Sequence, residues 1–136
     1  MKLLIMYCES FGYKTSIKTL EEEAHVDEDK AIGDAVVGFI NMEAEDTANE
    51  SKVETKLVKI LKWAANKNDT KTIVLHSFAH LSESKAEPAV VKQLLNRAAE
   101  RIEGAGFQTH QTPFGYFLDL DIQAPGHSLA RIFKSF

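Results

Sequence analysis

The sequence predicts one α/β domain over residues 1–136, built as a mixed β-sheet with two main helices packed on it. Two observations predict this class. Short apolar runs typical of buried strands alternate along the chain with two longer segments whose apolar residues recur at helical spacing. With 136 residues, 44% of them hydrophobic and 26% charged, the chain has the size and composition of a folded domain with one core.

The N-terminal segments predict three strands. The apolar run from Lys2 to Tyr7 is typical of a buried strand, and residues Phe11 to Ile17 alternate as a second strand would. Together these runs predict a hairpin. The acidic segment Glu21 to Asp34 predicts an irregular connection, and Ala35 to Met42 predicts the next strand.

The first predicted helix begins at Asp46 or Thr47 and ends near Asn66 or Asn68. Its predicted apolar face contains Val53, Leu57, Ile60, Leu61 and Ala64. The opposite face carries four lysines at roughly helical spacing, Lys52, Lys56, Lys59 and Lys62. A phosphate-facing stripe is one interpretation, but a solvated helix face is the more common explanation of such a pattern.

The remaining segments predict three strands and a second helix. Lys71 to Leu75 predicts a central strand, and Pro88 suits the first turn of a helix that ends at Gly104 or Gly106. The predicted apolar face of that helix contains Val91, Leu94, Leu95, Ala98 and Ile102. Strands are predicted from Phe107 to Gln111 and from Tyr116 to Gln123; the second is half-exposed.

Charge is divided unevenly along the chain, whose net charge is −4. Residues 1–50 contain 4 basic and 12 acidic side chains, whereas residues 51–136 contain 12 and 8. A nucleic-acid contact is therefore expected in the second part.

The single Cys8 excludes an internal disulfide, and no apolar run approaches the ~20 residues of a membrane span, so we expect a soluble, cytoplasmic protein without a membrane partner.

Common catalytic motifs give weak signals. His76 and His80 are four residues apart, but they follow a strand and no Glu or Cys cluster accompanies them, so no metal is expected. Ser77 lacks the Gly-x-Ser-x-Gly turn of a serine hydrolase, and Cys8 is expected to pack as a small core residue. No Walker-type loop is present, and no cofactor is expected.

Three segments place aromatic, small and imidazole side chains just past the ends of apolar runs: His76 to Leu81, Pro113 to Phe117, and Gly126 to Ala130. An α/β fold usually builds a pocket at such positions. With these segments, nearly the whole chain resembles the archaeal threonyl-tRNA synthetase editing domain. The resemblance rests on Lys2 to Ile5, Ala35 to Glu43, Phe78 to Ser82, Leu95 to Arg97, Gly106-Phe107, Pro113 to Tyr116 and Gly126-His127.

The resemblance implies a D-aminoacyl-tRNA deacylase-like fold and substrate-assisted hydrolysis of serine from mischarged threonine tRNA. Backbone groups and a ribose hydroxyl of the tRNA would position the attacking water, so no side-chain nucleophile is required. The implied lining of an aminoacyl-adenosine pocket is Met42, Phe78, Ala79, His80, Phe114, Gly115, Tyr116 and Phe117. For Phe78 and Phe114, plain packing in the core is the more common explanation. His80 would donate a hydrogen bond to substrate, or alternatively tie its own turn by bonding local carbonyls.

This chain departs from the family at four positions. Leu118 stands where the family carries a lysine, and Phe117 stands where it carries a tyrosine. Arg131 corresponds to a family glutamate, and Glu87 corresponds to a family lysine. Because the last two reversals are complementary, one hypothesis is a swapped ion pair in which Arg131 supplies the catalytic cation and Glu87 its counter-ion in the pocket. The other is that both lie on the surface.

Three functions stay open from the sequence: a serine-specific editing hydrolase, an editor of altered specificity, and a catalytically silent relative that binds aminoacyl-tRNA ends or a partner synthetase. The resemblance also implies a homodimer, and the strand Lys2 to Tyr7 would present a hydrophobic edge in need of cover. The domain is expected to be either free-standing or the front end of a longer synthetase.

Overall fold

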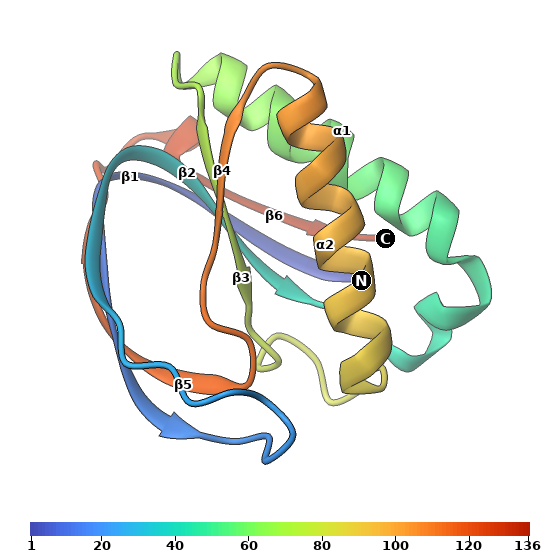
Figure 1. Cartoon of the computed structure of the whole chain (residues 1–136). Helices are drawn as coiled ribbons and strands as arrows, with labels where there is room; N and C mark the ends of the chain where they lie inside the picture. Colours follow the sequence, from blue (N-terminus) through green and yellow to red (C-terminus); the bar gives the residue numbers. More distant parts are fainter.

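A computed structural model describes all residues, 1–136, as a curved six-stranded sheet with two α-helices on one side (Figure 1). The elements in chain order are β1 (Lys2–Lys18), β2 (Asp29–Asn41), the 3-10 turn η1 (Ala44–Asn49), α1 (Glu50–Lys67), β3 (Thr72–Ser77), α2 (Pro88–Gly104), β4 (Gln108–Gln111), β5 (Tyr116–Gln123), η2 (Ser128–Ala130) and β6 (Arg131–Ser135).

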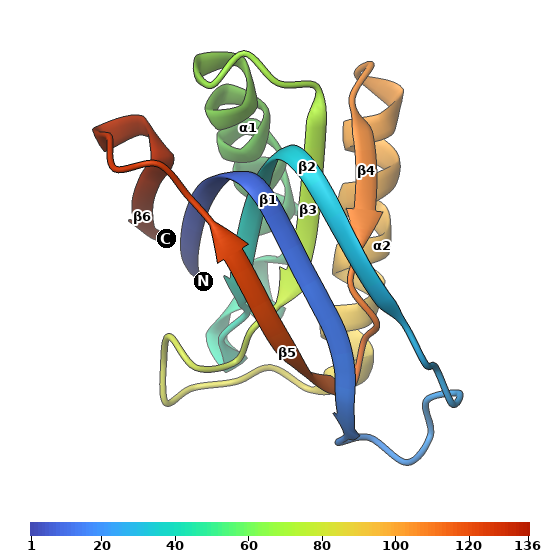
Figure 2. The ribbon, with the colours of Figure 1, turned by 90° about the vertical axis from the view of Figure 1, so that its left-hand side faces the viewer.

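The sheet is mixed, with the order β4-β3-β2-β1-β5 and with β6 also paired to β1. Strand β1 pairs antiparallel with β2, β5 and β6, whereas β2–β3 and β3–β4 are parallel pairs. The two parallel crossovers contain α1 and α2, which places both helices on the same face. Figure 2 shows the strands with both helices behind them.

The main core lies between the sheet and the helices. It combines Leu3 and Ile5 of β1 with the apolar faces of α1 and α2, and the residues predicted for those two faces are buried except for the partly buried Ile60. A second cluster lies on the other face of the sheet around Phe11, Phe39 and Val74. Glu54 of α1 reaches Arg97 and Arg101 of α2 at 2.6 and 2.9 Å, so the two helices are also joined by ion pairs.

Three predictions about the strands need correction, and one strand was not predicted. Residues Lys2 to Ile17 form one long strand rather than a hairpin, because the alternation continues through Cys8 and Ser10 in register with β2. Strand β2 already begins at Asp29, so the last six of the fourteen residues in the predicted acidic connection are strand. The C-terminal strand β6 was not predicted. Strand β1 is not an edge, because β2 covers one side and β5 and β6 cover the other.

The other predicted boundaries agree with the structure to within a few residues. Helix α1 follows a 3-10 turn and ends at Lys67 with Asn68 as its C-cap, and Pro88 is the first residue of α2. Three of the four lysines on α1, Lys52, Lys56 and Lys59, are exposed. No helix of the structure is both long and apolar enough to span a membrane.

The two ends of the chain meet beside β1 (Figure 2). The buried ammonium group of Met1 lies 3.0 Å from Glu43 and 2.9 Å from Asp46, and it also donates to the carbonyl of Phe136. Ser82 donates to the second carboxylate oxygen of Glu43 at 2.7 Å. The hydrogen bond from Ser82 and the Met1 ammonium group hold the pKa of Glu43 below its usual range. Glu43 therefore ties the chain start to the loop that follows β3.

Candidate functional site

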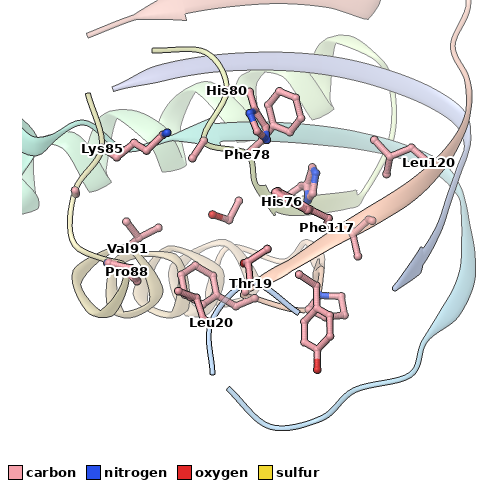
Figure 3. Close-up of a pocket in the computed structure, with 18 residues that line it drawn as sticks. Thr19, Leu20, His76, Phe78, His80, Lys85, Pro88, Val91, Phe117 and Leu120 are labelled. Carbon is pink, nitrogen blue, oxygen red and sulfur yellow. The ribbon is translucent and has the colours of Figure 1, made fainter. Parts of the chain in front are cut away.

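A cleft of about 480 Å³ opens where β3 ends, between α2, the loop after β3 and the start of β5 (Figure 3). This volume lies within the range of small-molecule sites. The lining residues are Thr19, Leu20, His76, Ser77, Phe78, Ala79, His80, Lys85, Ala86, Pro88, Val91, Pro113, Phe114, Gly115, Tyr116, Phe117, Leu118 and Leu120. The position agrees with the general rule that α/β sheets bind ligands beyond the carboxyl ends of parallel strands.

The loop from Phe78 to Glu87 is organised by one buried side chain, Asn41, at the end of β2. Its Oδ1 accepts the backbone N–H groups of Leu81 and Ser82, each at 2.9 Å. Its Nδ2 donates to the carbonyls of Met42 at 3.3 Å and Ser84 at 3.2 Å. Because Asn41 is only 1% exposed and fully hydrogen-bonded, it fixes the wall of the cleft in one conformation.

His76 lies at the base of the cleft as a neutral imidazole. It is 5% exposed, its Nδ1 lies 2.9 Å from the Thr112 hydroxyl, and its ring packs edge-on against Phe39 at 5.3 Å. Burial first, and the nearby His80 second, lower the pKa of His76 from an ordinary 6.5 to about 4. The ring therefore shapes and polarises the cleft floor without carrying charge near neutral pH.

Because the pKa of His76 is lowered in the folded protein, we expect the protein to lose stability at acid pH. The unfolded chain takes up a proton near pH 6.5 but the folded protein only near pH 4, so stability falls as pH drops through this window, by about 3 kcal/mol in full. Urea unfolding of the wild-type protein and His76→Gln between pH 7.5 and pH 4 measures the effect. The variant should show a shallower loss, since all other titrating groups are shared. Parallel pH dependences would contradict the assignment.

Aromatic rings form a row along one wall. The Phe78 ring packs against His80 with centroids 4.9 Å apart, and His80 lies 6.1 Å from Phe117. Phe117 is 52% exposed, so much of its ring is open to solvent. Figure 3 shows Phe78 and His80 on the wall opposite Val91, Pro88 and Leu20. Exposed rings of this kind provide stacking surfaces for a nucleobase.

The other wall is the connection between β1 and β2, residues 19–28, which packs on the start of β5. Thr19 N–H donates to the carbonyl of Gly115 at 2.7 Å. The Tyr116 hydroxyl donates to the carbonyl of Ala24 and accepts from Val26 N–H, both at 2.8 Å. Gly115 has φ +82, and a Cβ there would lie 3.1 Å from the Leu20 Cβ. The close approach of the two segments therefore requires a glycine.

Most of the predicted site residues lie together in the cleft, since Phe78, Ala79, His80 and the run from Phe114 to Leu118 line it. Three do not. Met42 is buried in the main core, Glu87 is an exposed residue before α2, and Arg131 lies on β6. The segment Gly126 to Ala130 also lies outside the cleft. These three residues and this segment therefore do not line the cleft.

The swapped ion pair between Glu87 and Arg131 does not form. The Arg131 guanidinium donates to the carbonyls of Pro125 at 3.1 Å and Ala124 at 3.5 Å, and no carboxylate lies within ion-pair distance. It caps the turn before η2 instead. The alternative, that both residues lie on the surface away from each other, is correct because β6 pairs with β1 and not with the strands at the cleft.

Four residues that line or hold the cleft were not predicted: Asn41, Lys85, Thr19 and Leu20. Asn41 carried a usable signal, because a polar residue ends an otherwise unbroken apolar strand and such a residue must find partners when buried. Lys85 and the pair Thr19-Leu20 carried none. They reach the cleft only through the path of two loops, which side-chain periodicity does not describe.

Comparison with known proteins gives a family for the whole chain. A family model described as the archaea-specific editing domain of threonyl-tRNA synthetase matches residues 1–136. The threonine–tRNA ligase of Pyrococcus horikoshii is 26% identical over 138 residues, covering 99% of this chain and 22% of the ligase. The ligase of Methanosphaera stadtmanae is 28% identical over 137 residues, again covering 99% and 22%. The chain thus spans less than a quarter of these relatives.

The fold also has a solved counterpart. The c-Myc DNA Unwinding Element Binding Protein aligns with a TM-score of 0.68 and 13% identity, covering 100% of this chain and 99% of that one. At this identity the likeness concerns the fold alone. The predicted fold class, a D-aminoacyl-tRNA deacylase-like mixed sheet with two main helices packed on it, is confirmed.

Proposed function

Because this chain belongs to the family of archaea-specific editing domains of threonyl-tRNA synthetase, we propose that it hydrolyses serine wrongly attached to threonine tRNA. The observation that carries the proposal is the cleft of about 480 Å³, whose lining combines the half-buried ring of Phe78 and the exposed rings of His80 and Phe117 with the main chain of a fixed loop. Such a cleft has room for an adenosine that carries a small amino acid.

The reaction needs little from side chains. A water oxygen bonds to the ester carbonyl carbon, the bond between this carbon and the ribose oxygen breaks, and the ribose oxygen takes up the proton that the water loses. Free serine and a tRNA with its ribose hydroxyl restored are the products. The protein must hold the ester, place the water and stabilise the developing oxyanion with fixed donors. Backbone groups near Ala79 are our candidates for the last role, because Asn41 holds their loop rigid.

Roles for the remaining residues follow from their places in the cleft. Phe78 and Phe117 offer faces for the terminal adenine, and His80 lies between their rings with its imidazole exposed. We assign His80 the hydrogen bond to substrate.

A serine ester differs from a threonine ester by one methyl group, worth ~1–3 kcal/mol in a binding site, so a second selective site improves accuracy.

A panel of mischarged tRNAs tests this function with the full chain. We expect turnover of seryl threonine tRNA and little of threonyl threonine tRNA. His80→Ala should lower the serine rate about 100-fold, in the range of one lost transition-state donor. His127→Ala is the matched control, because His127 is an exposed histidine outside the cleft, and its rate should equal that of wild type. An unchanged rate in His80→Ala would remove His80 from the mechanism.

One observation favours a second candidate function. At the two positions where the resemblance implies a tyrosine and a lysine, Phe117 and Leu118 line the cleft and contribute neither hydroxyl nor charge. An editor of another aminoacyl group, or a silent protein that still binds aminoacyl-tRNA ends, fits this apolar wall. The same panel separates the cases: turnover of a different pair indicates altered specificity, and binding without turnover of any pair indicates a silent relative.

We further propose as partners the 3′ end of threonine tRNA, a threonyl-tRNA synthetase catalytic domain and a second copy of this chain. The dimer is supported by the exposed Phe133 on the outer strand β6, which is 55% exposed. Sedimentation of the purified chain checks this, since its monomer mass is 15.2 kDa. A species of that mass at all concentrations would contradict the dimer.

A further inference from the structure

Lys85 is the one side chain with a formal charge among the eighteen that line the cleft. It is exposed at the rim, and it forms no hydrogen bond or ion pair within the chain. The neighbouring carboxylates Glu83 and Glu87 lie beyond ion-pair distance from it. An ammonium group that faces a cleft without a partner is available for a ligand of opposite charge.

The backbone on both sides of Lys85 is held in place. The carbonyl of Ser84 accepts from the Asn41 side chain at 3.2 Å, and the N–H group of Ala86 donates to the carbonyl of Met42 at 3.0 Å. Ser84 Oγ also accepts from Ala44 N–H at 3.0 Å. The Cα of Lys85 is therefore fixed at the rim, and only the flexible side chain has to order when a ligand binds.

The cleft has two ends of different character. Figure 3 shows Lys85 at one end and Leu120 at the other, with Phe78, His76 and His80 between them. No Asp or Glu side chain lines the cleft. A cationic group of a ligand is therefore not attracted to the Lys85 end, whereas an anionic group is. The ligand should lie with its anion at Lys85 and its apolar or aromatic part toward Phe117 and Leu120.

We propose that Lys85 binds the 5′ phosphate of the terminal adenosine and so orients the substrate in the cleft. This proposal rests on the proposed function, because it assumes an aminoacyl-adenosine ligand. The phosphate is the one formal anion of such a ligand. It must also lie at the rim, where the rest of the tRNA leads away into solvent, and Lys85 is exposed there. The family lysine at the position of Leu118 is thus absent from this chain. Lys85 does not replace it, because Lys85 would bind the phosphate and not the reacting ester.

Two stable probes test the proposal: 3′-serylamino-adenosine, in which an amide replaces the ester, and the same molecule with a 5′ phosphate. Calorimetric titration of the full chain should show about five-fold tighter binding of the phosphorylated probe, as for one charge-assisted contact at an exposed site. Lys85→Gln should reduce this ratio to nearly one and leave binding of the unphosphorylated probe unchanged. Lys85→Arg should keep the preference.

Lys59→Gln is the matched control, because it removes an exposed lysine on α1 outside the cleft. The affinity ratio of the two probes should be the same for this variant as for wild type. If Lys59→Gln lowers the ratio as much as Lys85→Gln does, the preference comes from the overall charge of the protein and the proposal is overturned. The role of Lys85 is also overturned if Lys85→Gln leaves the affinity ratio unchanged, or if it weakens the binding of both probes equally. Either result leaves the proposed function intact. Failure of the wild-type protein to bind either probe refutes the proposed function, and the assignment of Lys85 with it.

Discussion

Replacing Asn41 with leucine is expected to lower the free energy of unfolding by about 3 kcal/mol and to abolish deacylation. Leucine has a similar volume, but it leaves the N–H groups of Leu81 and Ser82 and the carbonyl of Ser84 without the partners that Asn41 supplies. Unpaired polar groups that are wholly or partly buried are costly. The loop that forms one wall of the cleft would then lose its single conformation.

Urea unfolding and the mischarged-tRNA assay measure the two effects separately. Asn66→Leu is the matched control, since Asn66 is exposed on α1, and its stability should stay within ~0.5 kcal/mol of wild type. Asn41→Asp offers a finer test, because a carboxylate keeps the acceptor for the two N–H groups but faces the carbonyls of Met42 and Ser84 without a donor. Full activity in Asn41→Leu would show that the loop does not need this anchor.

Gly115→Ala is expected to lower stability by about 3 kcal/mol, from backbone strain and from crowding together. The residue has φ +82, which side chains disfavour, and its new Cβ would lie 3.0 Å from Glu23 Cγ and 3.1 Å from Leu20 Cβ. Leu20 and Glu23 must then shift by a few tenths of an ångström to relieve the close contacts. Because Leu20 lines the cleft, substrate affinity should fall as well.

Gly106→Ala separates strain from crowding. Gly106 also has a positive φ, +95, but a Cβ there meets nothing within 4 Å. Its loss of stability should therefore be only ~1 kcal/mol and its activity unchanged. Thermal unfolding of both variants gives the difference, which is the cost of displacing the connection. Equal destabilisation by the two substitutions would mean that the packing of Leu20 on Gly115 contributes nothing.

Much of the fold could be predicted from the pattern of side chains. The helical spacing of Val53 and Leu57, and of Val91 and Leu94, identified both helices, because each must bury one apolar face against the sheet. The alternation of side chains did not predict the full length of strands that continue through polar residues. Ser10 and Gly33 face each other in the β1–β2 pair, yet neither reads as a strand residue, so one long strand was predicted as two.

The candidate site, like the fold, could be predicted only in part. Residues Phe78 to His80 and Phe114 to Leu118 could be predicted because they follow strands, and strand ends converge at one edge of the sheet. Arg131 was not predicted correctly because β6 pairs with the first part of β1, beside β5 on the second part, and the sequence does not specify this pairing. Lys85 was missed because its position depends on hydrogen bonds from Asn41, about forty residues earlier in the chain.

The sequence by itself determined the family, the two helices and the groups that line most of the cleft, because local periodicity and strand ends are properties of neighbouring residues. Only the tertiary structure decided which loops close over the cleft and which charge faces it. Those depend on contacts between distant segments, such as Asn41 with the loop after β3 and Gly115 with Leu20, whose energies appear only when the chain is folded.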